Sequence, residues 1–119
     1  MKALTTKDIE DAMVGDPQFQ GIFAINRVKD LKVPKDQHVT FIANLQADNL
    51  PSNHWVAVRR SGGAAQYFDS AGRVPPPEIQ RWLVKNSSNW TYNNKLLQSL
   101  NDDTSCGYLC IAFVKNILE

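Results

Sequence analysis

The feature that most constrains the fold lies near the end of the chain, an apolar segment at residues 106–118. A polar run at 101–105 precedes it, in which Thr104 and Ser105 are candidate N-caps for a helix that begins at Cys106. Apolar side chains would cover nearly the whole circumference of this helix: Leu109, Cys110, Ile111, Ala112, Phe113, Val114, Ile117 and Leu118. Because such a helix needs other elements to cover it, we expect it to be buried against a sheet or between layers.

Cys106 lies at the predicted start of this helix. The positive end of the helix dipole favours a thiolate there, whereas a cysteine that only packs gains nothing from the position. Gly107 would leave the space beside the sulfur open and let a substrate backbone come close. A plainer interpretation is a capped helix with a cysteine at its mouth, because a lone cysteine near a helix start is a weak signal. Cys110, one turn further on, is expected to be a small core residue.

Two segments upstream are predicted to be the strands of a hairpin, 54–60 and 65–69, around the turn Ser61-Gly62-Gly63. His54 begins the first strand and Asp69 ends the second. Because the start of one strand lies beside the end of its antiparallel neighbour, the hairpin predicts a contact between His54 and Asp69. Taken alone, His54 would be a surface histidine at a strand start, and Asp69 would merely begin a turn.

The remaining segments supply the rest of a sheet and its cover. Thr5 or Thr6 is expected to cap a first helix that residues 15–17 end, and the prolines at 75–77 open a second helix that ends at 86–89. The other expected elements are extended segments at 19–25, 38–45, 90–92 and 96–97, and a surface loop at 26–37. Together they predict one α+β domain over residues 1–119. Its mixed or antiparallel central sheet would pack on the buried C-terminal helix that carries Cys106 at its N-terminus.

Cys106, His54 and Asp69 are the set of residue types that a cysteine nucleophile requires. The thiol needs a base to take its proton, and the base needs a third group to fix its tautomer and orientation. Gln98 adds a side-chain amide suited to an oxyanion hole, although a polar residue before a loop needs no special role. A metal site made of Cys106, Cys110 and His54 would lack a fourth ligand and the usual spacing, so no metal is expected.

The order of these motifs resembles a known family of enzymes. The motifs are His54-Trp55, Phe68-Asp69-Ser70, Gln98 and Ser105-Cys106-Gly107-Tyr108. They are similar to those of the adenovirus-protease and ubiquitin-like-protease group of cysteine peptidases, with the viral, adenain-like branch as the nearer match. The resemblance is dense from about Phe41 to Val114 and thin before that. No single motif is specific, but four in the right order are hard to obtain by chance.

The resemblance implies a cysteine endopeptidase with a His-Asp-Cys triad. Cys106 would attack the scissile carbonyl, and His54 would act first as base and then as acid toward the leaving amine. Asp69 would hold the imidazole. The amide of Gln98 and the backbone N–H of Cys106 would stabilise the oxyanion.

The resemblance also implies a substrate and its contacts. In the family, the Trp after the catalytic His lines a narrow channel over the substrate's glycines, so Trp55 and Gly107 are the expected substrate-binding residues. Cleavage would follow small residues, at Gly-Gly or Gly-X-Gly type sites of viral structural precursors, and the expected partner is a protein or polyprotein with such a site. Some members use an activating peptide or DNA. This sequence supports no cofactor, and it lacks a second cysteine outside the active helix to tether such a peptide.

Three other functions remain open at this stage. An isopeptidase that removes ubiquitin or a ubiquitin-like modifier would use the same residues. A Cys-dependent acyltransferase would form the same acyl-enzyme and pass the acyl group to Lys or Ser. A non-catalytic binding module would retain the pocket, but it would have no need for the complete four-residue set.

Composition narrows the partners and the compartment. The hydrophobic fraction of 43% and the charged fraction of 21% are those of a globular domain. A formal net charge of +1 provides no basic surplus for nucleic-acid binding, which leaves that partner undecided. No apolar run approaches the ~20 residues of a membrane span, so we expect neither membrane contact nor a signal peptide. Because a disulfide between two cysteines one helical turn apart is geometrically unlikely, we expect a reducing, intracellular compartment of a host, with the nucleus and the virion as candidates. We also expect the protein to be a monomer.

Overall fold

A mixed five-stranded sheet forms the middle of the molecule in the computed structural model, which describes residues 3–46, 54–93 and 105–116. The strands lie in sequence order across the sheet: β1 (Phe19–Ala24), β2 (Val39–Asn44), β3 (Trp55–Ser61), β4 (Ala64–Phe68) and β5 (Asn89–Tyr92). β3 pairs antiparallel with both β2 and β4. At the edges of the sheet, β1 pairs parallel with β2, and β5 pairs parallel with β4. The predicted α+β class with a mixed central sheet is confirmed.

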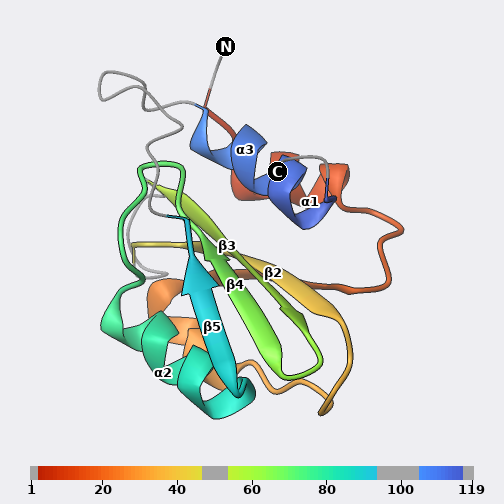
Figure 1. Cartoon of the computed structure of the whole chain (residues 1–119). Helices are drawn as coiled ribbons and strands as arrows, with labels where there is room; N and C mark the ends of the chain where they lie inside the picture. The colour runs from red at the N-terminus through yellow and green to blue at the C-terminus, as the bar shows by residue number, and fades with distance from the viewer. Residues whose placement is uncertain (1–2, 47–53, 94–104, 117–119) are drawn as a thin grey trace.

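Helices cover both faces of this sheet (Figure 1). One face carries α1 (Thr6–Ala12) and α3 (Cys106–Val114), and the other carries the 3₁₀ helix η1 (Ile25–Asp30) and α2 (Pro77–Asn86). The alternation of side chains along β3 separates the two cores. Trp55 and Ala57 pack toward α3, and Val56 and Val58 pack toward α2, because successive side chains of a strand point to opposite faces.

Local sequence explains where the elements begin and end. Thr5 and Asp8 form a capping box at the start of α1, with hydrogen bonds of 3.1 and 2.9 Å between each side chain and the other residue's backbone N–H. Gly15, with φ +87°, follows the end of this helix, as a left-handed residue should. Gly62, with φ +61°, makes the tight turn between β3 and β4. These outcomes match the predictions from the sequence.

Three predictions need correction. The segment 26–37 is not wholly a loop, since η1 occupies its first part and buries Val28. Ser105 precedes α3 in a helical conformation, and its side chain makes no capping hydrogen bond, so the predicted cap is wrong for this residue. The helix ends at Val114 rather than continuing to 118, and Asn116 has a left-handed φ of 62°. Thr104 and the segment 96–97 lie outside the described residues.

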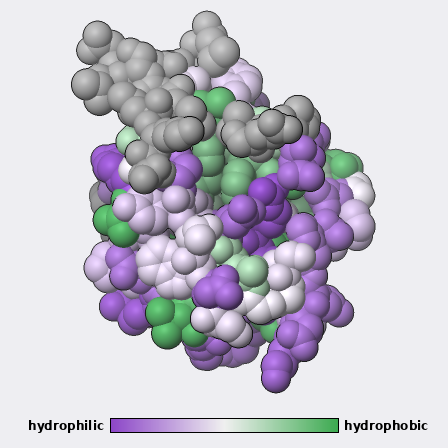
Figure 2. Space-filling view, viewed as in Figure 1, coloured by the Kyte–Doolittle hydropathy of each residue, from purple (hydrophilic) through white to green (hydrophobic). Residues whose placement is uncertain are grey.

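The surface over α3 is an apolar part of the face drawn in Figures 1 and 2. Figure 2 shows hydrophobic side chains gathered there, while hydrophilic and pale residues cover most of the rest of this face. Leu109 and Ile111 of α3 are only half-buried, and Tyr108 is exposed, so the helix is less enclosed than its composition predicts. Within the described ranges, none of the helices has the length and apolar character that crossing a membrane requires.

Candidate functional site

The hairpin brings His54 and Asp69 into contact at one end of the sheet. Ala57 on β3 lies opposite Phe68 on β4, so the residues just before and just after these two strands are neighbours. The His54 Nε2 and Asp69 Oδ1 atoms lie 2.7 Å apart. Because Nε2 faces the carboxylate, Nδ1 is the ring nitrogen left for a second partner.

Other groups of the chain besides His54 hold Asp69 in place. Its Oδ1 accepts a hydrogen bond from the Ala71 backbone N–H at 2.8 Å, and the Arg73 guanidinium Nε lies 3.3 Å from its Oδ2. The Asn93 side chain bridges the Asp69 backbone, accepting from its N–H at 2.9 Å and donating to its carbonyl at 2.6 Å. A neighbour of Asp69, Ser70, is fully buried as well.

These contacts keep Asp69 ionised although it is only 1% exposed. Burial by itself raises the pKa of this carboxyl, but the hydrogen bonds from His54 and Ala71 and the nearby positive charges hold the pKa below its ordinary value. A buried carboxylate of this kind can both orient an imidazole and stabilise its protonated form.

Cys106 is the first residue of α3, and its thiol interacts with the His54 imidazole. Burial alone would raise the pKa of the Cys106 thiol. The hydrogen bond and charge of His54, with the backbone N–H groups of Trp55 and Gly107, lower this pKa below its ordinary value instead. Burial also lowers the pKa of His54, but its contacts with Asp69 and Cys106 outweigh that effect and raise the pKa to about 9. The pair therefore favours a thiolate next to an imidazolium.

Cys110 contrasts with Cys106. It is fully buried one turn further along α3, and burial raises the pKa of its thiol well above the ordinary value, with the charges of Cys106 and Asp69 acting in the same direction. The two thiols of one helix thus differ in the direction of their pKa shifts, and the expectation of a core role for Cys110 is confirmed.

Trp55 and Gly107 lie beside Cys106, but the space between them is filled. Trp55 is 3% exposed, and its indole Nε1 donates to the Leu4 carbonyl oxygen at 3.2 Å. A Cβ on Gly107 would lie 3.1 Å from the Leu4 side chain and 3.2 Å from the Trp55 ring. The glycine therefore lets Leu4 and the indole approach the start of α3, so the predicted open space beside the sulfur is occupied by these two side chains.

The site is closed in this structure. Cys106 is 3% exposed and the His54 side chain 14%, so a substrate carbonyl reaches the sulfur only after neighbouring side chains move. Gln98, the expected oxyanion donor, lies outside the described residues. Among residues 3–46, 54–93 and 105–116, no group of three or more His, Cys, Asp and Glu side chains could hold a metal ion.

Sequence reasoning missed three residues around the site. Asn93 fixes the Asp69 backbone, and Arg73 adds a positive charge beside its carboxylate. Asn44, on β2 opposite Trp55, is 5% exposed, and its amide nitrogen has no hydrogen-bond partner among the residues that the structure describes. Of these three, only Arg73 could have been suspected from the sequence, because it follows Asp69 by four residues, directly after the expected turn.

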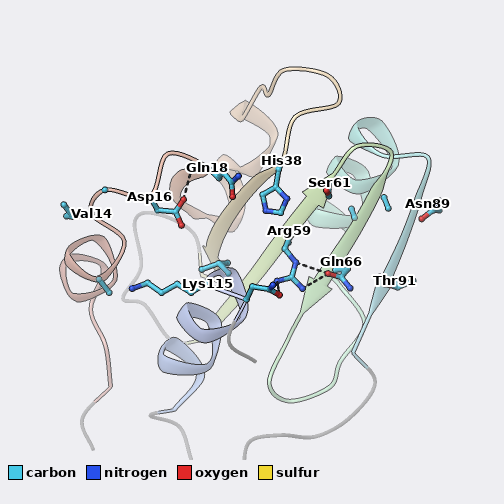
Figure 3. Close-up of a pocket in the computed structure, with 16 residues that line it drawn as sticks. Val14, Asp16, Gln18, His38, Arg59, Ser61, Gln66, Asn89, Thr91 and Lys115 are labelled. Atoms are coloured by element: carbon cyan, nitrogen blue, oxygen red, sulfur yellow. Dashed lines mark hydrogen bonds between the residues drawn. The ribbon is translucent and has the colours of Figure 1, made fainter. Parts of the chain in front are cut away.

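A cleft of about 1090 Å³ lies at the C-terminal end of α3, and neither His54 nor Cys106 lines it (Figure 3). Arg59 on β3 crosses this cleft and makes hydrogen bonds of 3.0 and 2.7 Å to Gln66 on β4. It also donates to the Phe113 carbonyl at 2.8 Å and stacks its guanidinium over the Phe113 ring. Arg59 therefore ties the C-terminal end of α3 to the sheet, which holds Cys106 in place from the far end of the helix.

Comparison with known proteins supports the fold of this site's scaffold. No protein-family model matches the chain, and no curated protein matches its sequence. Two solved structures of the ASFV pS273R protease are similar, one with a TM-score of 0.60 over 97% of this chain and 58% of that chain. The other, a selenomethionine form, has a TM-score of 0.56 over 97% and 59%. Both are 20% identical to this chain, which therefore shares their fold and spans less than two thirds of their length.

Proposed function

We propose that this chain is a cysteine peptidase in which Cys106, His54 and Asp69 form the catalytic triad. The observation that carries the proposal is the 2.7 Å contact between a buried carboxylate and an imidazole, together with the interaction of that imidazole with a thiol at a helix start. The similarity of the fold to a viral protease supports it. A binding module would not need a histidine pKa near 9 beside a thiol with a lowered pKa.

The pKa shifts determine the order of the chemical steps. The Cys106 thiolate attacks the scissile carbonyl and forms a C–S bond, and the oxyanion then collapses as the C–N bond breaks. The His54 imidazolium gives its proton to the leaving amine. Neutral His54 next takes a proton from water as it attacks the thioester, which releases the carboxylate product and restores the pair. Asp69 keeps the ring oriented throughout and stabilises its positive charge.

Two donors are proposed for the oxyanion. The backbone N–H of Cys106, in the first turn of α3, has no intrahelical acceptor and points along the helix dipole toward the start of the helix. The side-chain amide of Gln98 is the second proposed donor to the oxyanion, because Gln98 precedes Cys106 in the same motif order as in the resembling peptidases.

The proposed substrate is a protein or polyprotein with a glycine before the scissile bond, such as a viral structural precursor. A large ring at Trp55 beside the sulfur supports this, because a backbone without a Cβ needs less displacement of Trp55 and Leu4 to reach it. We further propose that the domain works as a monomer without a cofactor. Since both cysteines are free, we propose a reducing compartment for it, such as the host nucleus or the virion.

The test is covalent capture by a peptide vinyl sulfone that ends in Gly-Gly. The intact protein should gain one adduct, and peptide mapping should place it on Cys106. Cys106→Ala should abolish the adduct and His54→Ala should slow its formation, while His38→Ala, which changes the other histidine, should leave it unchanged. A folded wild-type protein that forms no adduct, or that is modified equally on Cys110, would overturn the proposal.

A further inference from the structure

A second cleft lies between α2 and η1, on the face of the sheet opposite α3. This α2–η1 groove has a volume of about 590 Å³, within the range of ligand sites. Its apolar floor is made of Ile25, Leu31, Val33 and Trp82. Neither His54 nor Cys106 lines it, so the groove is separate from the candidate active site.

Positive charges surround this floor on both walls. Arg81 and Lys85 lie one turn apart on the exposed side of α2, and Lys29 and Lys32 lie on the η1 side. Glu78 is the acidic residue that lines the groove. Four cations against one carboxylate is a local surplus that the chain's net charge of +1 conceals.

These four cations are available to a partner. The ion pairs among the described residues are Lys7–Asp11, Arg27–Asp30 and the two at Asp69, and none of them uses a cation of the groove. Their side chains are exposed, so each is free to meet an incoming negative charge. Exposed pairs are individually weak, but several around one apolar centre select for charge and register.

The walls are already fixed in place. The Trp82 indole Nε1 donates to the Leu31 carbonyl oxygen at 3.1 Å, which joins α2 to the opposite wall. Buried Arg60 donates to the carbonyl oxygens of Pro34 at 2.5 Å and Asn86 at 3.2 Å, which joins the same two walls at the end of the groove. Because the groove is preformed, binding requires little ordering of the protein.

We propose that the α2–η1 groove binds an acidic peptide segment that carries one aliphatic or aromatic anchor residue. The anchor enters the apolar floor, and carboxylates on either side of it meet the four cations. Single-stranded nucleic acid fits less well, because it needs exposed aromatic faces for stacking and Trp82 is only 4% exposed. A membrane surface fits less well too, because the apolar groups are recessed below the cations instead of projecting beyond them.

The probe for this site is a short fluorescein-labelled peptide with a central Leu-Phe flanked by Glu and Asp. Fluorescence anisotropy with the full chain should show saturable binding that weakens as salt rises from about 0.05 M to about 0.3 M. A peptide with Ser at both anchors and a peptide with Gln for every acid should each bind at least roughly tenfold more weakly.

Charge reversal on the exposed side of α2 locates the site. The double variant Arg81→Glu/Lys85→Glu should weaken binding by roughly tenfold or more, since two attractions become repulsions. The matched control Lys7→Glu/Lys115→Glu makes the same change in net charge away from the groove, and it should stay within about twofold of wild type. Amide shifts in a ¹⁵N correlation spectrum should map to η1 and α2.

Several outcomes would overturn the proposal. They are the absence of saturable peptide binding by the folded wild type, equal weakening by the two double variants, and amide shifts confined to other elements. Tighter binding of a single-stranded oligonucleotide or of phosphatidylserine vesicles, lost in Arg81→Glu/Lys85→Glu, would replace the peptide with that ligand. Because the readout is binding, its result is independent of whether Cys106 is a nucleophile.

Discussion

Removing the imidazole beside Cys106 should change how the thiol reacts with iodoacetamide at mildly acidic pH. In His54→Ala the hydrogen bond and the charge that lower the thiol pKa are lost, while burial, which raises it, remains. A thiol with an ordinary pKa of about 8.5 is only about 0.3% ionised at pH 6, which is about 300-fold less thiolate than a fully ionised group. A more basic thiolate is also a better nucleophile, which offsets part of this loss. We therefore expect the labelling rate at pH 6 to fall by about 10- to 100-fold.

The assay measures the rate of alkylation by intact mass at a series of pH values. Wild type should be labelled once at pH 6, whereas the rate for His54→Ala should drop about tenfold for each pH unit below the thiol pKa. His38→Ala is the matched control, and Cys106→Ser identifies the modified residue. Superimposable profiles for wild type and His54→Ala would refute the reasoning, because the thiolate would then owe nothing to the histidine.

The remaining predictions concern turnover of a Gly-Gly peptide and stability. The rate should follow a bell-shaped pH profile, because the thiolate is lost as pH falls through the lowered pKa of Cys106 and the imidazolium is lost as pH rises through about 9; an alkaline limb near 7 would contradict this. Asp69→Asn should keep the circular dichroism spectrum and lower kcat by about 10²-fold or more, and an unchanged kcat would remove Asp69 from the triad. Asn93→Ala should lower the free energy of unfolding by about 1–2 kcal/mol and reduce kcat, since two hydrogen bonds to the Asp69 backbone are lost, whereas Asn89→Ala on the exposed part of β5 should do neither. Gln98→Ala should lower kcat by about 10²–10³-fold with little change in KM, and normal kcat would assign the oxyanion to another donor.

Periodicity and turn chemistry were enough to predict much of the fold. The hairpin was readable because two strand-like segments flank a Gly-Gly turn, and its geometry alone places His54 beside Asp69. The apolar character of α3 predicted a helix that begins at Cys106. Its length was overestimated because an apolar pattern does not reveal where a left-handed residue such as Asn116 ends a helix.

Residues that act across long separations in sequence could not be predicted. Leu4 packs on Gly107 and accepts a hydrogen bond from Trp55, a contact between the beginning and the end of the chain for which no local pattern exists. Asn93 reaches Asp69 across 24 positions because β5 pairs in parallel with β4, and strand order is not readable from one sequence. Neighbouring strands and caps leave a periodic signal, whereas such bridges depend on the assembled fold.

The separation of Cys106 from His54 and Asp69 along the chain also bears on the order in which the molecule assembles. His54 and Asp69 are joined by a single hairpin, and hairpins close within about 1–10 μs. Cys106 follows much later in the chain and reaches them only through non-local packing of α3 on β3, which is the slower kind of contact. During synthesis His54 and Asp69 thus leave the ribosome and can pair before Cys106 emerges. On the proposed function, a nascent chain carries no peptidase activity until α3 has docked.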